Sequence, residues 1–244
     1  YANVGKLKQQ VKRVVLLGPA HRVYVEGIAL PSNTHFGSPL GNVEIDTKTL
    51  AQLNSRYSFV NYIDEAHVQE HSLEVHLPFL QKVLDDFSLL PLLVGNAQPE
   101  QLEQVLDELW GGDETLIVIS SDLSHYLDYN TAQKIDSQTT RLIEDFDYQH
   151  IGPKQACGCR PVSGLLKVAG KKGMSLTTLD LRNSGDTAGN KDRVVGYGAY
   201  ALYEQLLDST DRQQVFEVIR KSIGQGLKTS KALKPKPENY AAHL

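Results

Sequence analysis

The sequence has few of the features that mark a cross-linked, membrane-bound or nucleic-acid-binding protein. Its 244 residues include two cysteines, Cys157 and Cys159, which lie too close together to staple a fold, so we expect a reducing, cytoplasmic compartment. No apolar run approaches the ~20 residues that cross a bilayer, and we expect no signal peptide. The net charge of −4 lacks the basic surplus of nucleic-acid binders.

What is present is the composition of an ordinary globular protein. Hydrophobic residues make up 41% of the chain and charged residues 22%. This length suits one large domain, or one domain followed by a fragment. Because the chain starts at Tyr1 rather than at a methionine, we expect it to belong to a longer polypeptide.

Short apolar runs alternate with amphipathic stretches along the chain. The apolar runs predict strands at Val14–Leu17, Leu89–Val94, Leu116–Ile119, Leu176–Leu181 and Val194–Tyr203. The amphipathic stretches predict helices at Thr47–Tyr57, Pro99–Trp110, Asn130–Phe146 and Pro161–Ala169. This alternation predicts an α/β fold with a layered central β-sheet flanked by helices. The long stretch from Val23 to Val43, with its glycines and prolines, is expected to be a functional loop.

Two of the predicted strands end in residues that can carry chemistry. The run Val14–Leu17 stops at a Gly-Pro pair, and His21 follows directly. The run Leu116–Ile119 leads into Asp122 and His125. Open α/β sheets bind ligands at the carboxyl ends of their strands, so we expect these three side chains to share one pocket. The alternative is that His21 only caps a turn.

A second group of metal-compatible side chains lies in a short acidic and histidine-containing segment, at His67, Glu70, His71, Glu74 and His76. The spacing is not that of a His-Glu-x-x-His zinc helix. On a helix, His71 and His76 would point about 140° apart, so at most one of them joins a given site. For His67 and His76 we favour an exposed position near a helix start.

Two further segments are candidates for the same pocket. Cys157 is a candidate soft metal ligand, because Gly158 permits close backbone approach and Pro161 can open a helix whose N-terminal field lowers a thiol pKa. The alternative is a buried, inert cysteine. Asn183 and Asp186 follow a predicted strand and form either a third loop at the carboxyl edge or only a turn.

Taken together, five ordered motifs resemble those of the Memo family, whose prokaryotic members are also called system protein B of the AMMECR–Memo–radical-SAM set. The resemblance extends from Tyr1 to about Tyr203. It rests on Gly18-Pro19-Ala20-His21, Glu70-His71-Ser72-Leu73-Glu74-Val75-His76-Leu77-Pro78, Ser120-Ser121-Asp122-Leu123-Ser124-His125, Cys157-Gly158 and Asn183-Ser184-Gly185-Asp186.

The resemblance implies a fold similar to that of class III extradiol ring-cleavage dioxygenases, in which two histidines and a carboxylate hold a non-haem iron. It implies that His21 is one imidazole ligand and that Cys157 replaces the carboxylate, with Asp122 and His125 as a flanking catalytic pair. His125 resembles the acid/base histidine of those enzymes. The family's other histidine ligand belongs to a Pro-His-Ala-Gly-Tyr segment, which we expect before Tyr1. His71, Asn183 and Asp186 are the remaining expected pocket residues.

Function and cofactor are likewise expectations from the resemblance. Iron(II) is the first expected metal and copper the second, because a thiolate favours softer metals. We expect a metal-dependent redox protein or dioxygenase acting on a small molecule or a modified residue. The alternatives are a peptide- or phosphotyrosine-binding module, or a metal carrier. AMMECR-type and radical-SAM proteins are expected partners.

The end of the chain carries a second resemblance. Residues Gln213 to Leu244 look like the start of an AMMECR-type domain, and the amphipathic stretch Asp211–Leu227 predicts a helix. We therefore expect a Memo-like domain over residues 1–207, followed at 208–244 by a linker and the start of a truncated second domain.

Overall fold

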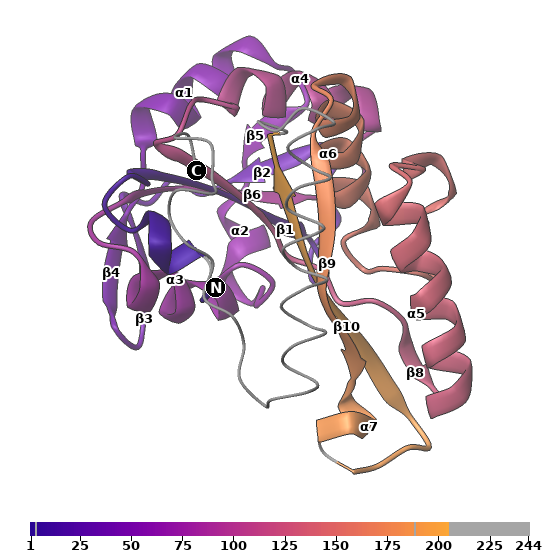
Figure 1. Cartoon of the computed structure of the whole chain (residues 1–244). Helices are drawn as coiled ribbons and strands as arrows, with labels where there is room; N and C mark the ends of the chain where they lie inside the picture. Colours follow the sequence, from indigo (N-terminus) through magenta and orange to yellow (C-terminus); the bar gives the residue numbers. More distant parts are fainter. Residues whose placement is uncertain (3, 188, 205–244) are drawn as a thin grey trace, which may run out of the picture. The chain divides into compact units, whose positions relative to one another are not determined.

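The computed structural model describes residues 1–2, 4–187 and 189–204 (Figure 1). By its contacts the chain divides into one unit of residues 1–172 and 176–201 and another of residues 173–175 and 202–244. The predicted helix Asp211–Leu227 and the AMMECR-type domain at 208–244 lie outside the described residues. Among the helices of the described part, none combines the length and hydropathy of a membrane-spanning segment.

A five-stranded mixed sheet forms the centre of the first unit. Its strand order is β5-β2-β6-β1-β7. The strands are β1 (Arg13–Pro19), β2 (Ile28–Leu30), β5 (Val60–Tyr62), β6 (Ser88–Val94) and β7 (Thr115–Ile119). β1 runs parallel to both β6 and β7, whereas β2 pairs antiparallel with β6 and parallel with β5. The predicted α/β fold with a layered central sheet is confirmed.

β1 is buried on both faces, as its unbroken apolar run predicts. Val14 to Leu17 are all fully inaccessible to solvent. Because side chains alternate along a strand, Val15 and Leu17 pack into one hydrophobic cluster and Val14 and Leu16 into another on the opposite face. One strand therefore contributes to both cores.

Helices cover both faces of this sheet (Figure 1). The cluster of Val15 and Leu17 also contains residues of α1 (Thr47–Arg56), α4 (Pro99–Leu109) and α6 (Cys159–Lys171). The cluster of Val14 and Leu16 contains residues of α2 (Asp64–Val68) and α3 (Leu77–Val83). The result is a three-layer arrangement with the sheet in the middle.

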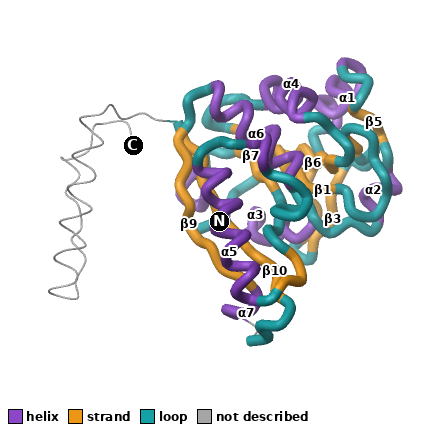
Figure 2. The backbone as a smooth tube through the Cα atoms, turned by 90° about the vertical axis from the view of Figure 1, so that its right-hand side faces the viewer, coloured by secondary structure: helices purple, strands orange, loops and turns teal. Residues whose placement is uncertain are grey.

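A second, three-stranded sheet has the order β8-β10-β9. Its strands are β8 (His125–Leu127), β9 (Ser175–Asn183) and β10 (Val194–Tyr203), and the four-residue α7 (Ser184–Thr187) follows β9. The long helix α5 (Tyr129–Glu144) runs beside β9 and β10 (Figure 2). Ile143 of α5 packs near Leu181 and Tyr200 in a third, smaller core.

The short elements were harder to predict than the long ones. The stretch from Val23 to Val43, expected to be a loop, contains β2, β3 (His35–Ser38) and most of β4 (Gly41–Glu44). Strands of three or four residues are too short for a period-2 pattern to emerge. β7 is only half-buried, because it lies at the edge of the sheet.

Gly18, near the end of β1, allows an unusually close approach of a distant segment. A Cβ placed there would lie 2.8 Å from both Leu73 Cδ2 and Ser72 Oγ. We predict that Gly18→Ala lowers the free energy of unfolding by about 1–3 kcal/mol through overpacking, as measured by urea denaturation. Gly37→Ala is the matched control, because its Cβ would meet nothing closer than 3.7 Å. Equal stability of the two variants would show that this approach is not tight.

Candidate metal centre at the carboxyl edge of the sheet

The parallel pairing of β1 and β7 brings the two predicted strand ends together. Leu17 lies opposite Ile119, and the Ser120 amide continues the pairing by donating to the Leu17 carbonyl at 2.8 Å. His21 follows the end of β1, and Asp122 and His125 follow the end of β7. Adjacent parallel strands thus deliver all three residues to the same edge of the sheet.

Three side chains at this edge form a group with the spacing of metal ligands. Asp122, His125 and Cys157 each offer one ligand atom, and these atoms lie within 4.8 Å of one another. His125 Nε2 is 3.5 Å from Asp122 Oδ2. All three residues are half-buried, so the group is held by the fold but open to small molecules.

Cys157 reaches the group from a third direction, immediately before α6. Its position depends on Gly158, where a Cβ would lie 2.6 Å from the Ser120 carbonyl oxygen. The Asp122 amide donates to Cys157 Sγ at 3.2 Å, and the Gly158 amide donates to Ser121 Oγ at 2.9 Å. The close backbone approach predicted for Gly158 is therefore present, and it joins the start of α6 to the end of β7.

The surroundings of Cys157 favour its thiolate. Burial by itself raises the pKa of the Cys157 thiol, but contacts with the His21 imidazole, the Asp122 amide and the Ser121 hydroxyl outweigh it and lower that pKa. Thiolate, rather than thiol, is the form that binds metals.

His21 is the counterpart of that thiolate. Contact with Cys157 and interaction with Glu70 raise the pKa of His21 to about 9, against the opposing effect of burial. An imidazole with a raised pKa thus lies beside a thiol with a lowered pKa.

Glu70 contacts His21 rather than the ligand group. Its buried carboxylate accepts the His21 main-chain amide at 2.6 Å and lies 3.1 Å from His21 Nδ1. The sequence marked Glu70 only as one metal-compatible residue among several, and this supporting role was missed. The sequence signal for this role was the Glu-His pair at Glu70, but the role can be inferred only when the position of His21 in the fold is known.

The other histidines of that segment differ in their surroundings. The His71 imidazole is 63% exposed and its Nδ1 contacts Glu74 at 2.9 Å, so no described contact links it to the ligand group. His67 and His76, which we expected to be exposed, are both half-buried. His67 Nε2 contacts the Ala29 carbonyl at 3.2 Å, and His76 Nδ1 contacts the Tyr1 hydroxyl. Both positions arise because the segment packs onto the sheet instead of projecting from it.

Asn183 and Asp186 are engaged with the turn between β9 and α7. Asn183 Oδ1 accepts the Gly185 amide at 2.9 Å, and Asp186 accepts the Asn183 amide at 2.8 Å and the Tyr129 hydroxyl at 2.6 Å. No described contact joins either side chain to Cys157. Their place in the pocket stays a prediction.

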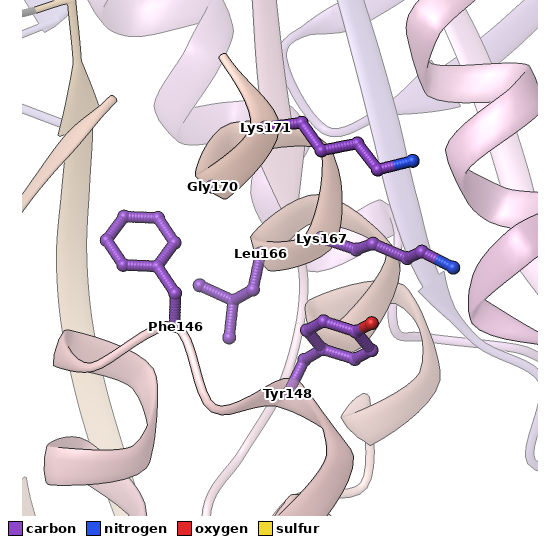
Figure 3. A pocket seen from close by; sticks show the side chains of 6 residues that line it. All are labelled: Phe146, Tyr148, Leu166, Lys167, Gly170 and Lys171. Carbon is purple, nitrogen blue, oxygen red and sulfur yellow. The ribbon is translucent and has the colours of Figure 1, made fainter. Parts of the chain in front are cut away.

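A separate hollow of about 280 Å³ lies over α6 (Figure 3). None of the ligand-group residues lines it; its lining is Phe146, Tyr148, Leu166, Lys167, Gly170 and Lys171. The two lysine side chains extend away from the Phe146 ring (Figure 3) and pair with Glu103. The positive charges of both lysines are thus balanced by a carboxylate, and we assign no reactive centre to this hollow.

Comparison with known proteins finds a matching family profile and similar sequences. A family profile described as Memo-like protein matches residues 1–201. A MEMO1 family protein of Metallosphaera sedula is 33% identical over 196 residues, covering 75% of this chain and 70% of the relative. One of Methanosarcina mazei is 35% identical over 198 residues, covering 76% and 73%.

The two cysteines are predicted to differ in reactivity. Burial raises the pKa of Cys159, whereas that of Cys157 is lowered. In chelator-treated protein, Cys157 should therefore be alkylated by iodoacetamide at a lower pH than Cys159, as quantified by peptide mass spectrometry.

Removal of His21 tests the cause of this difference. His21→Ala should slow alkylation of Cys157 at neutral pH, because loss of the imidazole contact raises the pKa of the thiol and lowers its thiolate fraction. His150→Ala is the control, because His150 is exposed and paired with Asp147. Unchanged alkylation in the His21 variant would show that His21 does not lower the pKa of the Cys157 thiol.

Proposed function

Because the chain belongs to the Memo-like protein family, we propose that its cluster binds one transition-metal ion and serves a redox reaction on a small molecule. The observation that carries this proposal is the spacing of Asp122, His125 and Cys157, whose ligand atoms lie within 4.8 Å of one another. His21, in contact with Cys157, adds a second imidazole to the donor set.

The donor set fits a first-row transition metal better than calcium or magnesium. Thiolate and imidazole are ligands of iron, copper and zinc, whereas calcium and magnesium take oxygen ligands. His21 and Cys157 are the proposed principal ligands, with Asp122 and His125 beside them. The carboxylate of Glu70 behind His21 is the outer-shell partner that metal-binding histidines commonly have. Iron(II) is our first choice of metal and copper the second.

When bound, the metal would supply the redox chemistry, including a reaction with dioxygen. The residues of the chain supply proton transfer and access. His125 is the proposed acid/base, because it is half-buried and its Nε2 lies 3.5 Å from Asp122 Oδ2. Asp122 would orient the His125 ring. The half-exposed face of this pair leaves room for a substrate.

Metal carriage is the second candidate function. It is favoured by the exposure of the ligand group, since the side chains of His21 and Asp122 are 45% and 48% accessible. Ligand side chains that are this accessible to solvent would allow a soft metal ion to be transferred to a partner protein.

Metal binding is tested with cobalt(II) and iron(II) titrations under reducing, oxygen-free conditions. We predict one ion per chain and a thiolate-to-cobalt charge-transfer absorption. Cys157→Ser should abolish this absorption and weaken binding at least about 10–100-fold, because even outer-shell changes have that effect. Cys159→Ser, the matched control, should keep both. Identical titrations of the two variants would contradict the proposed ligand set.

Redox activity is tested by oxygen uptake of the iron-loaded chain with a panel of catechols. We predict that His125→Ala lowers oxygen uptake per bound iron about 10²–10⁴-fold, the usual contribution of general acid–base catalysis. A wild-type chain that binds iron but consumes no oxygen with any catechol would favour carriage over oxygenation.

A further inference from the structure

Glu70 carries an unusual concentration of hydrogen bonds for a single carboxylate. Its side chain is only 3% exposed. Oε2 accepts the His21 amide at 2.6 Å, and Oε1 accepts the amides of His71 at 2.9 Å and Ser72 at 3.0 Å. Oε1 also lies 3.1 Å from His21 Nδ1. Four N–H groups thus converge on this buried charge.

We propose that Glu70 is the positioning residue of the centre, which holds His21 in one tautomer and one orientation and thereby reserves its Nε2 for the ligand side. An ionised carboxylate only accepts hydrogen bonds, so the His21 Nδ1 in contact with it carries the proton. In the neutral ring, Nε2 is then left with the lone pair that binds a metal. As a role in metal binding, this inference rests on the proposed function.

The backbone of His21 is held by the same carboxylate. The hydrogen bond from the His21 amide to Oε2 fixes the main chain, and the contact at Nδ1 fixes the orientation of the ring. A ring restrained at both places has little freedom to turn. Position and tautomer are therefore determined together.

A second contact fastens the Glu70 segment to β1. Ser72 Oγ donates to the Pro19 carbonyl at 2.9 Å, and the fully buried Leu73 approaches Gly18 closely. The segment that bears Glu70 is thus packed onto β1, the strand that leads to His21. The Gly-Pro-Ala-His and Glu-His-Ser-Leu motifs therefore form the two sides of one packing contact.

Glu70 is not itself a ligand in this arrangement. Its oxygens are already occupied by four donors, and it lies outside the group Asp122, His125 and Cys157. Asp136 offers a useful comparison, since it is equally buried and accepts the Ser124 amide at 2.9 Å, but none of its described hydrogen bonds is to an imidazole. Asp136→Asn is therefore a matched control for the loss of a buried carboxylate.

The tautomer of His21 is measured by long-range ¹H–¹⁵N correlation on ¹⁵N-histidine-labelled, chelator-treated protein, at a pH above the His21 pKa of about 9, where the ring is neutral. Of the eight histidines, His21 is identified as the signal that His21→Gln removes. We expect a protonated Nδ1 whose proton exchanges slowly with water. Glu70→Gln should keep this proton, since an amide oxygen can still accept it, whereas Glu70→Ala should lose the slow exchange. Asp136→Asn should change neither.

The metal titration then separates the two proposals. We expect Glu70→Gln to weaken cobalt(II) binding by about 10–100-fold through loss of the carboxylate charge, while Asp136→Asn binds like the wild type. A wild-type His21 whose proton resides on Nε2 overturns the positioning role without any variant having to fold. A protonated Nδ1 in a chain that binds no cobalt or iron would refute the metal site and leave the tautomer assignment standing. Metal binding that Glu70→Ala leaves unchanged would refute the positioning role alone.

Discussion

The parallel pairing of β1 with β7 is the contact on which the candidate site depends. β1 is buried on both faces and hydrogen-bonded along both edges, so its end has a fixed position. The edge strand β7 takes its register from β1, and its own end then places Asp122 and His125 beside the end of β1. Residues more than 100 positions apart in sequence lie at the same edge of the sheet because two short apolar strands are neighbours.

Two close backbone approaches turn this strand pair into a site. At Gly18 the segment of Ser72 and Leu73 packs against β1, and at Gly158 the start of α6 packs against the residues after β7. The first approach brings Glu70 behind His21, and the second brings Cys157 beside Asp122. A larger side chain would crowd the Ser120 carbonyl oxygen at Gly158 and the side chains of Ser72 and Leu73 at Gly18.

Much of the framework was predictable from local pattern. The long strands and helices follow from apolar runs and amphipathic stripes, because burial on one or two faces leaves a direct trace in sequence. The placement of His21, Asp122 and His125 at one edge of the sheet followed from the rule that neighbouring parallel strands present their carboxyl ends together. The short strands β2 to β5 were not predictable, because three or four residues carry too little pattern. The role of Glu70 was missed because it depends on a partner 49 positions away.

The sequence by itself determined the α/β class, the buried β1 and the identity of the residues able to bind a metal, since these depend on local composition and spacing. Only the tertiary structure decided which of those residues act together. It joined Cys157 to Asp122 and His125, directed His71 toward Glu74, and made Glu70 a support for His21. The physical reason is that a hydrogen bond or a shared ligand position depends on distances of a few ångströms between segments, and these distances are set by how the segments pack.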